Sequence, residues 1–517
     1  MGAHPGAARP LPQPSEPAPA IVARGLVRRF GGVRALEGVD IEAGAGSLVV
    51  VLGPNGAGKS TLLGILAGLT RPDAGRVLVA GQDLNRAPAA ARLEVGLVSH
   101  QPLVYPELTA EENLRFHAKL YGLPADAEAL RPALEAADLW RQRHRRVRDF
   151  SRGMRQRLAI ARAILHAPAV LLLDEPFTGL DPAAADRLAD RLLGLAADGH
   201  ALLVTTHDLE RARALAHGLV ILDRGRVVWS GPATDPAASD LASLYRRLTA
   251  AQPGPGPAPR AGAPEPGAAA PSDDSGAVPA GPGRVRSTAA PPGLISAALS
   301  LAWKDLWVEL RAREILPPVL VFALLATVIF QFALPREPAG QVVGAAGALW
   351  IALLLGSTLG LSRAMGSELD SGGMTGLRMA PVDRGSIFLG KWLSGYALGL
   401  LVAVGLLPAG VVWLGIPVDR LPALAMVVAL GMVGWVAAGT LLSAMAVGTR
   451  AREVLLPVLL FPVVLPLIIP CVQFTSTLLS PPPVAGPSQV LPLALVLAFD
   501  VIFLVLGFLL LPFVVEA

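Results

Sequence analysis

Hydrophobic and polar positions along the chain form two different patterns with a featureless stretch between them. From Ile21 to about residue 249, short apolar runs such as SLVVVLG, AVLLLDE and ALLVTTH alternate with amphipathic stretches such as STLLGILAGL. This alternation predicts an α/β domain over residues 21–249. Residues 250–293 are mostly Pro, Gly and Ala without apolar periodicity, which predicts a linker. Residues 1–20 lack the apolar core of a signal peptide and are expected to be a disordered tail.

Beyond the linker, the pattern is that of a membrane domain. A segment that begins at Leu294 repeats apolar residues at helical spacing, and its Trp303 and Trp307 are expected to anchor it at the membrane surface. Six apolar stretches follow, each long enough to cross a hydrocarbon layer of about 30 Å. They cover about 315–334, 342–361, 387–416, 421–448, 454–479 and 490–515. The predicted fold is therefore an α/β domain followed by an all-α polytopic membrane domain over residues 294–517.

Composition and charge agree with this division. Only 16% of the residues are charged, against about 25% in a typical soluble protein, which argues against a single soluble enzyme. The formal net charge of +4 lies in the first 293 residues, because residues 294–517 hold 11 basic and 11 acidic residues. No block of like charge is longer than the stretch 141–148, so a nucleic-acid partner is not expected. The single cysteine, Cys471, excludes an internal disulfide.

The basic residues of the membrane half are unevenly distributed between its two sides. The opposite loops carry only Arg336 and Arg420, whereas all other basic residues flank the side of the α/β domain. Those residues are Lys304, Arg311, Arg313, Arg363, Arg378, Arg384, Lys391, Arg450 and Arg452. The positive-inside rule therefore predicts that the α/β domain and both termini are cytoplasmic and that membrane lipid surrounds the six helices.

A glycine-rich segment follows the strand SLVVVL and precedes a predicted helix. It reads Gly53, Pro54, Asn55, Gly56, Ala57, Gly58, Lys59, Ser60 and Thr61. This is the P-loop pattern, in which glycines let backbone N–H groups surround phosphate oxygens at the positive end of a helix. Lys59 is expected to reach the β- and γ-phosphates, and Ser60 to ligate Mg²⁺. Taken alone, the motif indicates only a nucleotide-binding protein.

Two adjacent acids end a predicted buried strand further along the chain. Asp174 is expected to hold Mg²⁺, and Glu175 to polarise the water that attacks the phosphate. A glutamate at the end of a strand is often only solvated. Its position beside Asp174 and before the sequence PFTGLD favours the catalytic interpretation.

At this point residues 21–230 resemble the ATP-binding cassette (ABC) family. The segment FSRGMRQRLAIAR resembles the family signature, GLD its D-loop, and LVTTHD the segment that carries its switch histidine. The resemblance implies that Ser151, Gly153 and Asp181 contribute to ATP binding, that His207 takes part in hydrolysis, and that Phe30 stacks on adenine. Otherwise His207 would be an ordinary core histidine. The implied fold is an α/β P-loop ATPase that uses ATP and Mg²⁺.

The chain departs from the family pattern in two places. Arg152 stands where the signature usually has glycine, and Met154 where it usually has glutamine. The glutamine-loop position, counted back from the sequence PELT, falls on His100, with Gln101 one residue later. Either residue could sense Mg²⁺ or water, and the sequence does not decide between them.

Because the signature of one family member closes the phosphate site of a second, the resemblance also implies partners. The chain has one cassette and one six-helix domain, so it is expected to form a homodimer with two composite ATP sites.

Three features of the membrane half are candidates for coupling or transport. The segment 362–386, with Glu368 and Asp370, is expected to form a coupling helix that contacts the cassette, the alternative being a solvated loop. Four prolines in the fifth stretch predict a kinked or partly re-entrant span. Asp500 falls near the centre of the last span, where an acid either serves function or is paired for structural reasons.

Residues 294–517 carry a second resemblance. The sequences SELDSGGMTGLRMAPVDRGSIFLGKWL, GTRAREVLLPVLLFPVVLPLIIP and LAFDVIFLVLGFLLLPFVVE are similar to the B subunit of the cytochrome c maturation system. The cassette is similar to the A subunit, so the chain resembles a fused A–B pair. This resemblance implies a protein of the bacterial cytoplasmic membrane that couples ATP hydrolysis to haem delivery or to the release of a haem-loaded chaperone. Further cytochrome c maturation membrane subunits and a haem chaperone are the implied partners.

The distribution of potential haem ligands limits this interpretation. All eight histidines lie at or before His217, so the membrane half offers only Cys471, Tyr396 and methionines as side chains that ligate haem iron. Haem is therefore expected to be a cargo rather than a tightly bound cofactor. Two other functions remain open, namely an ABC-type exporter of a drug, lipid or polysaccharide and an ATPase that remodels a membrane complex without moving a substrate.

Overall fold

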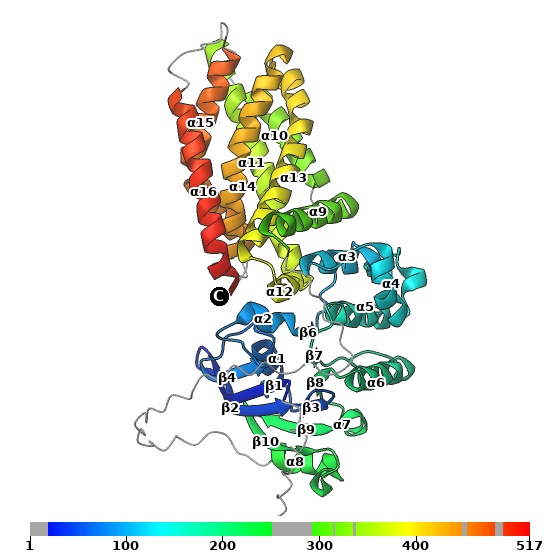
Figure 1. Cartoon of the computed structure of the whole chain (residues 1–517). Helices are drawn as coiled ribbons and strands as arrows, with labels where there is room; N and C mark the ends of the chain where they lie inside the picture. Colours follow the sequence, from blue (N-terminus) through cyan, green and yellow to red (C-terminus); the bar gives the residue numbers. More distant parts are fainter. Residues whose placement is uncertain are drawn as a thin grey trace, which may run out of the picture. The chain divides into compact units, whose positions relative to one another are not determined.

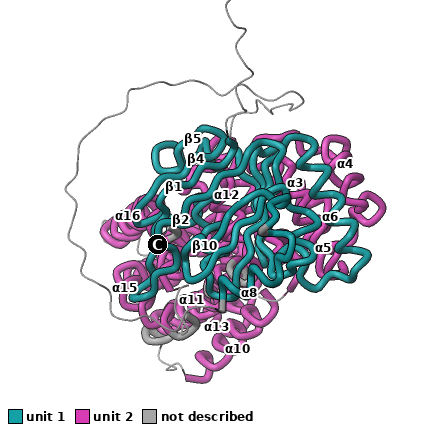
Figure 2. Tube along the Cα trace, turned by 90° about the horizontal axis from the view of Figure 1, so that it is seen from below, with its two compact units in different colours: residues 1–100, 167–286 teal, residues 101–166, 287–517 magenta. Residues whose placement is uncertain are grey.

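The computed structural model describes residues 19–250, 292–313, 316–333, 338–446, 452–480 and 490–516. The predicted tail and linker lie almost entirely outside these residues. The chain divides into two compact units, shown in different colours in Figure 2. Unit 1 comprises Met1–His100 and Ala167–Arg286, and unit 2 comprises Gln101–His166 and Ser287–Ala517. Part of the sequence expected to belong to the cassette thus shares a unit with the membrane helices.

Unit 1 contains two sheets (Figure 1). The first has the strand order β2-β1-β4-β5, and the second has the order β10-β9-β3-β8-β7-β6. The strands are β1 Ile21–Phe30, β2 Val33–Ala43, β3 Leu48–Leu52, β4 Ala74–Val79, β5 Gln82–Asp83, β6 Val95–Val98, β7 Val170–Asp174, β8 Ala201–Thr206, β9 Gly218–Asp223 and β10 Arg226–Pro232. The helices are α1 Lys59–Leu66, α2 Pro88–Leu93, α6 Pro182–Ala197, α7 Leu209–Leu215 and α8 Leu241–Ala250.

The predicted apolar runs form the centre of the larger sheet. Strands β3, β7 and β8 are buried along their whole length and pair in parallel. Continuous apolar sequence is typical of parallel strands that are covered on both faces. The register places Asp174 opposite Thr205, so the carboxyl ends of β7 and β8 lie side by side. The α/β fold predicted for this part of the chain is confirmed.

Unit 2 begins with a small helical segment over residues 101–166. Its helices are α3 Ala110–Leu120, α4 Ala127–Ala136 and α5 Arg152–Ile164. Thr109 and Glu112 form a reciprocal capping box at the start of α3. A core that includes Leu114, Leu134 and Leu158 joins the three helices.

The rest of unit 2 is helical, with seven long helices and the short helix α12 among the described residues, as shown in Figure 1. They are α9 Leu294–Ala312, α10 Leu316–Ala333, α11 Pro338–Asp370, α12 Gly373–Met379, α13 Arg384–Leu414, α14 Leu421–Ala446, α15 Arg452–Leu479 and α16 Val490–Glu516. Six segments within the described residues are long and apolar enough to cross a membrane, and their ends differ from the predicted ones by at most five residues. The prediction of six membrane-spanning helices is confirmed.

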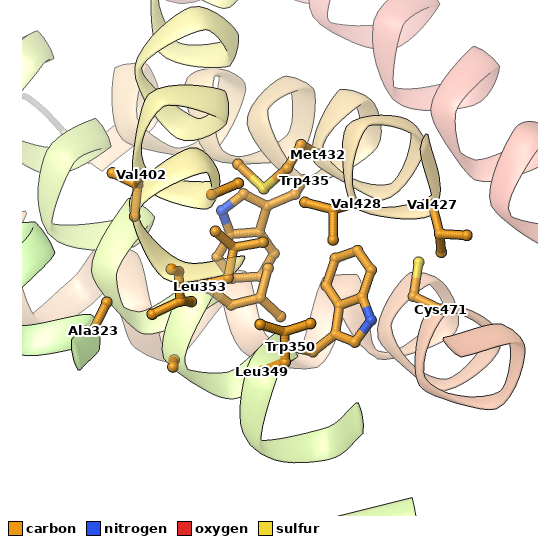
Figure 3. Packing of buried hydrophobic residues seen from close by; sticks show 14 of the residues in the cluster. Ala323, Leu349, Trp350, Leu353, Val402, Val427, Val428, Met432, Trp435 and Cys471 are labelled. Carbon is orange, nitrogen blue, oxygen red and sulfur yellow. The ribbon is translucent and has the colours of Figure 1, made fainter. Parts of the chain in front are cut away.

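Close packing between the membrane helices depends on small residues of α14. A Cβ atom at Gly431 would lie 2.5 Å from the Trp350 ring and 2.8 Å from Cys471 Sγ. Figure 3 shows these two side chains near Val427 and Val428, and Cys471 is a buried free thiol. The Trp350 indole donates to Thr475 Oγ1 at 3.0 Å, which satisfies its polar atom inside the core.

The fifth span is a continuous helix and not the partly re-entrant segment that was one of the two predictions for it. Pro457, Pro462, Pro466 and Pro470 all lie within α15, which runs as one helix from Arg452 to Leu479. The partly re-entrant alternative is therefore wrong. Prolines are tolerated in membrane helices because neighbouring groups replace the lost backbone bonds.

The amphipathic segment forms α9, and its predicted apolar face points outward. Ile295, Leu299 and Trp303 are 71%, 54% and 62% exposed. The opposite face packs on α13, where a Cβ atom at Gly390 would lie 2.5 Å from Leu301 Cβ. Trp303 thus fits its predicted place at the membrane surface, whereas Trp307 donates its indole hydrogen to Glu112 at 3.2 Å.

Candidate ATP site and membrane charge cluster

The loop between β3 and α1 approaches neighbouring backbone so closely that two positions require glycine. A Cβ atom at Gly53 would lie 2.3 Å from the Leu222 carbonyl oxygen. Gly58 has a φ of +104°, and a Cβ atom there would lie 2.4 Å from the Ala35 carbonyl oxygen. The loop is therefore held tightly from outside, with Asn55 and Gly56 exposed at its tip. The shape fits a phosphate group bound by backbone N–H groups.

Lys59 places a positive charge inside this loop. It is the first residue of α1, is only 7% exposed, and donates to the carbonyl oxygens of Gly53 at 2.6 Å and Pro54 at 3.3 Å. The ammonium group therefore lies beside the free N–H groups at the start of α1. Positive charge combined with a helix N-terminus is a suitable environment for phosphate.

A chain of hydrogen bonds connects the loop to the ends of β7 and β8. Ser60 Oγ donates to Asp174 Oδ2 at 2.9 Å, and Thr205 Oγ1 donates to Asp174 Oδ1 at 2.6 Å. Hydroxyl and carboxylate oxygens are the ligands that Mg²⁺ prefers. The predicted metal ligands Ser60 and Asp174 are thus in direct contact, and their chemistry fits the ion.

Glu175 adopts a left-handed backbone conformation, which the sequence around it does not predict. Its φ is +49°, in the left-handed region, which costs a non-glycine residue about 1–2 kcal/mol. Its N–H group lies 3.1 Å from both the carbonyl oxygen and Oγ1 of Thr205, which stabilises the turn. The carboxylate then lies 2.9 Å from His207 Nδ1 and 3.8 Å from Lys59 Nζ. Unit 1 therefore brings Lys59, Ser60, Asp174, Glu175 and His207 together.

The other predicted residues of unit 1 lie at exposed positions. Phe30 ends β1, is 49% exposed, and has the Arg28 guanidinium 4.7 Å from its ring centre. His100 is exposed in the turn after β6. Asp181 caps α6, where its side chain accepts from Ala184 N–H at 2.8 Å.

The remaining residues predicted to contact ATP belong to unit 2. Ser151 is exposed at the N-cap of α5 and accepts from Met154 N–H at 3.3 Å, and Gly153 lies in the first turn. Gln101 is half-buried, and its Oε1 lies 2.5 Å from the position that a Cβ atom of Gly372 would take. The glutamine side chain thus points at the beginning of α12.

A buried charge cluster joins α9, α11 and α13. Glu368 Oε2 accepts from Lys304 Nζ at 2.8 Å and from Lys391 Nζ at 2.6 Å. Asp305 completes the cluster, with 2.5 Å to Lys304 and 3.0 Å to Lys391. Glu368 Oε1 accepts the phenolic hydrogen of Tyr105 at 2.6 Å, and Lys304 Nζ lies 4.1 Å from the centre of that ring.

The charges in the cluster stabilise one another. Burial alone would raise the pKa of Glu368, but Lys304 and Lys391 hold that pKa below its usual value. Burial alone would lower the pKa of Lys304, but Asp305 and Glu368 raise it. Burial and the Glu368 charge both raise the pKa of Tyr105, so its phenol keeps its hydrogen. At neutral pH Glu368 is therefore ionised, Lys304 is protonated, and the Tyr105 phenol acts as a hydrogen-bond donor.

The predicted coupling segment is a helix with buried contacts. Residues up to Asp370 continue α11, and the short helix α12 follows, with Gly373, Gly376, Leu377 and Met379 buried. A Cβ atom at Gly373 would lie 3.0 Å from the Tyr105 ring, and one at Gly376 would lie 3.6 Å from the His117 ring. The solvated-loop alternative is therefore wrong. The side chain of Asp370 lies outside the described part of the structure.

A second contact joins the 101–166 segment to α9. Arg311 donates both terminal nitrogens to the Glu112 carboxylate, at 2.6 and 2.8 Å. Burial alone would raise the pKa of Glu112, but Arg311 lowers it. The residue that caps α3 therefore also binds α9.

Asp500 is buried inside the membrane unit. It is 4% exposed, and a Cβ atom at Gly434 of α14 would lie 2.3 Å from its Oδ1. Neither carboxylate oxygen has a hydrogen-bond partner among the described residues. The structural pairing considered for this acid is therefore not found within them.

Comparison with known families agrees with both halves. The chain matches the family described as ABC transporter over residues 36–178 and the family described as CcmB protein over residues 296–517. The daunorubicin resistance ATP-binding protein DrrA3 of Streptomyces coeruleorubidus is 40% identical over 218 residues, which cover 42% of this chain and 69% of that protein. The chain belongs to the ABC transporter family, as an ATP-hydrolysing member with a CcmB-like membrane domain.

The cassette is also similar to two further proteins. The Nod factor export ATP-binding protein I of Burkholderia lata is 39% identical over 210 residues, which cover 40% of this chain and 69% of that protein. A solved structure described as the ATP binding subunit of an ABC transporter is 34% identical, covers 44% of this chain and 99% of its own, and has a TM-score of 0.42. ATPase domains of this family bind ATP, typically with Mg²⁺, and work as dimers with composite ATP sites.

Several important residues were missed at the sequence level. Tyr105, Lys304, Asp305 and Lys391 surround Glu368, yet only Glu368 was singled out as a possible functional residue. One signal was available, because a lysine inside a span is rare and usually has a partner. Lys391 is such a residue, lying within the third span.

Proposed function

We propose that the chain is the ATPase–permease of a cytochrome c biogenesis system, which couples ATP hydrolysis to haem delivery or to the release of a haem-loaded chaperone at the outer face of the cytoplasmic membrane. The observation that carries this proposal is the match of residues 296–517 to the CcmB family in the same chain as an ABC ATPase. Because the membrane domain receives the work of hydrolysis, its family is the more informative about cargo.

In the proposed ATP site, each residue acts through the atoms described above. The loop from Gly53 to Gly58 and the start of α1, including Thr61, bind the phosphates together with Lys59, while Phe30 stacks on adenine. Ser60 and Asp174 hold Mg²⁺, which neutralises phosphate charge when bound. Glu175 accepts a proton from the attacking water, and His207, 2.9 Å away, orients its carboxylate.

The proposed partners follow from the position of the signature residues. Ser151 and Gly153 lie at the exposed N-terminus of α5, where they close the ATP site of a second copy. Asp181 of the D-loop lies at the same dimer contact. The functional form is then a homodimer, with the cassette and both termini cytoplasmic. Further cytochrome c maturation membrane subunits and a haem chaperone complete the assembly.

Movement of the cassette reaches the membrane helices through α12 and the charge cluster. Gln101 faces the N-terminus of α12, whereas His100 is exposed. This contact favours Gln101 over His100 as the residue that senses the ATP site. Glu368 receives the movement through its hydrogen bond with Tyr105. Asp500, buried without a partner among the described residues, is proposed to act in transport.

Haem is best treated as a cargo that partner subunits hold. The membrane half has no histidine, and Cys471 is buried in the helix core. Histidine is thus absent there and the cysteine inaccessible, which leaves only Tyr396 and methionines as side chains that ligate haem iron.

A second function has specific support. The curated relatives of the cassette are named for daunorubicin resistance and Nod factor export, which favours an ABC-type exporter of a drug, lipid or polysaccharide. The third candidate function is that of an ATPase that remodels a membrane complex without moving a substrate. Stimulation of ATP hydrolysis by a compound enclosed with the protein in liposomes would distinguish the exporter from the remodelling ATPase.

The decisive experiment is deletion of the gene followed by a haem stain for c-type cytochromes. We expect the stained bands to disappear and to return on complementation with the wild-type gene, but not with the Glu175→Gln variant. Normal bands in the deletion strain would refute the cytochrome c assignment.

A further inference from the structure

A cavity of about 570 Å³ lies within unit 2, beside the charge cluster. Its walls come from α9, α10, α11, α13 and α14 and from residues 105–107. This volume is within the range of small-molecule binding sites, about 300–1,000 Å³. The cavity is thus large enough to hold a ligand rather than a few water molecules.

The two ends of the cavity differ in polarity. One end is lined by the buried side chains Lys304, Glu368 and Lys391 and by the partly buried Asp305. The other is lined by apolar side chains of α10, α11 and α13 such as Val319, Leu361, Leu398 and Val402. The apolar residues belong to membrane spans, whereas Lys304, Asp305 and Glu368 lie just outside them. A ligand that fills this cavity must itself have a polar and an apolar end.

The charges around the cavity cancel. Its lining contains three cations, Lys304, Arg363 and Lys391, and four acids, of which Asp305, Glu309 and Glu368 balance these cations. The fourth acid, Glu107, pairs with Arg148 at 3.1 Å and Arg146 at 3.6 Å. A ligand with a net charge would be buried without a counter-charge, which is costly in a low-dielectric site. The polar end therefore fits a head with no net charge.

One hydroxyl in the lining lacks a partner. Thr440 is 3% exposed, and its Oγ1 has no hydrogen bond within the described chain. A buried hydroxyl without a partner is unfavourable unless something binds it. Ser443 and Ser394 also line the cavity, but both hydroxyls donate to backbone carbonyl oxygens. Thr440 is thus a polar group that a bound molecule can satisfy.

We propose that this cavity binds a zwitterionic phospholipid of the cytoplasmic leaflet, with its head at the Lys304–Asp305–Glu368–Lys391 cluster and near Thr440, and with the beginning of its acyl chains along the apolar wall. The proposal goes beyond the proposed function, because it holds whatever the cargo is. Tyr105 lines the same cavity and donates to Glu368. The lipid therefore contacts the ATPase part of the chain directly and supports its coupling to the membrane helices.

The test uses the full-length protein purified in detergent, offered phosphatidylethanolamine or phosphatidylglycerol, with retained lipid counted by native mass spectrometry. We expect retention of phosphatidylethanolamine in preference to phosphatidylglycerol. Thr440→Val replaces the hydroxyl by a methyl group of similar size and should weaken retention about 2- to 10-fold. Ala364→Leu fills part of the cavity and should abolish retention. Ala333→Leu, the same substitution at an exposed position outside the cavity lining, should have no effect.

Rates of ATP hydrolysis in liposomes provide a second readout. The wild-type rate should rise with the fraction of phosphatidylethanolamine, and the rate of the Ala364→Leu variant should not. Equal retention of phosphatidylglycerol, retention of haem that Ala364→Leu abolishes, or unchanged lipid retention in Ala364→Leu would each overturn the proposal. If the haem stain refuted the cytochrome c function, the lipid measurements would be unchanged. Failure of the lipid proposal can therefore be distinguished from failure of the proposed function.

Discussion

The phenol of Tyr105 donates a hydrogen bond of 2.6 Å to Glu368, a residue 263 positions further along the chain. Tyr105 precedes α3 in the sequence predicted to form the cassette, and Glu368 lies in α11, just beyond the second membrane span. The bond ends on a carboxylate that two lysines also bind. It therefore joins the ATPase half directly to three helices of the membrane half.

Replacing Tyr105 by Phe should weaken this connection. Loss of a buried hydrogen bond to a charged group should destabilise unit 2 by about 1.5–3 kcal/mol. ATP binding should persist, because Tyr105 lies outside the proposed ATP site. Thermal unfolding of the purified protein measures the first effect, and nucleotide affinity the second. Tyr121→Phe is the matched control, since it keeps the ring and removes a phenol that lies 3.5 Å from the Met379 carbonyl oxygen rather than beside a carboxylate. An equal loss in both variants would contradict the role of Tyr105.

Glu368→Gln should lower the stability of unit 2 more than Tyr105→Phe does, because Asp305 then remains as the one acid of the cluster for two buried lysines. Removing one partner from a buried ion cluster typically costs about 3–5 kcal/mol. The midpoint of thermal unfolding should fall accordingly. Adding Lys391→Met to this variant restores the charge balance and should recover part of the loss. A double variant less stable than Glu368→Gln alone would show that charge balance is not what Glu368 provides.

Glu175→Gln should retain ATP binding and lose nearly all hydrolysis. The substitution keeps the shape of the side chain but removes the proposed general base, which typically contributes about 10²- to 10⁴-fold to rate. Nucleotide binding by fluorescence and phosphate release at saturating ATP separate the two effects. Undiminished phosphate release would remove Glu175 from the proposed mechanism.

His117 predicts a specific dependence of stability on pH. Burial and the nearby charge of Arg162 hold the pKa of His117 well below the usual value for histidine, about 6.5. Because the unfolded chain binds this proton more readily, stability is complete above pH 6.5 and falls as the pH drops toward the folded-state pKa, by up to about 1.4 kcal/mol per pH unit. Unfolding midpoints at pH 7.5 and 5.5 should differ more in the wild type than in His117→Gln. Equal differences would show that His117 is not responsible.

Composite ATP sites predict that activity depends on self-association. The rate of ATP hydrolysis per chain should fall when the protein is diluted until light scattering shows monomers. Ser151→Arg, which blocks the proposed contact with a second copy, should lower the rate at every concentration. A constant rate of ATP hydrolysis per molecule in proven monomers would contradict the proposed dimer.

Much of this arrangement could be predicted from sequence because it depends on local patterns. Lys59, Ser60 and Asp174 belong to short motifs at the ends of strands, and each membrane span is a continuous apolar stretch. The cluster around Glu368 could not be predicted in this way. Tyr105, Lys304 and Lys391 come from distant parts of the chain, and their contacts depend on how helices pack. The left-handed conformation of Glu175 was equally invisible, since it depends on Thr205 of the neighbouring strand.

The grouping of residues 101–166 with the membrane helices has a practical consequence for anyone who divides the gene at the linker. The apolar cluster that contains Tyr105, Phe116 and Leu120 is completed by Leu377 and Ile387. A separately expressed cassette would present the first three side chains to water and should aggregate or bind detergent. Co-expressed as two polypeptides, the halves should reassemble through this cluster and the Arg311–Glu112 pair, so that the covalent connection between them is dispensable.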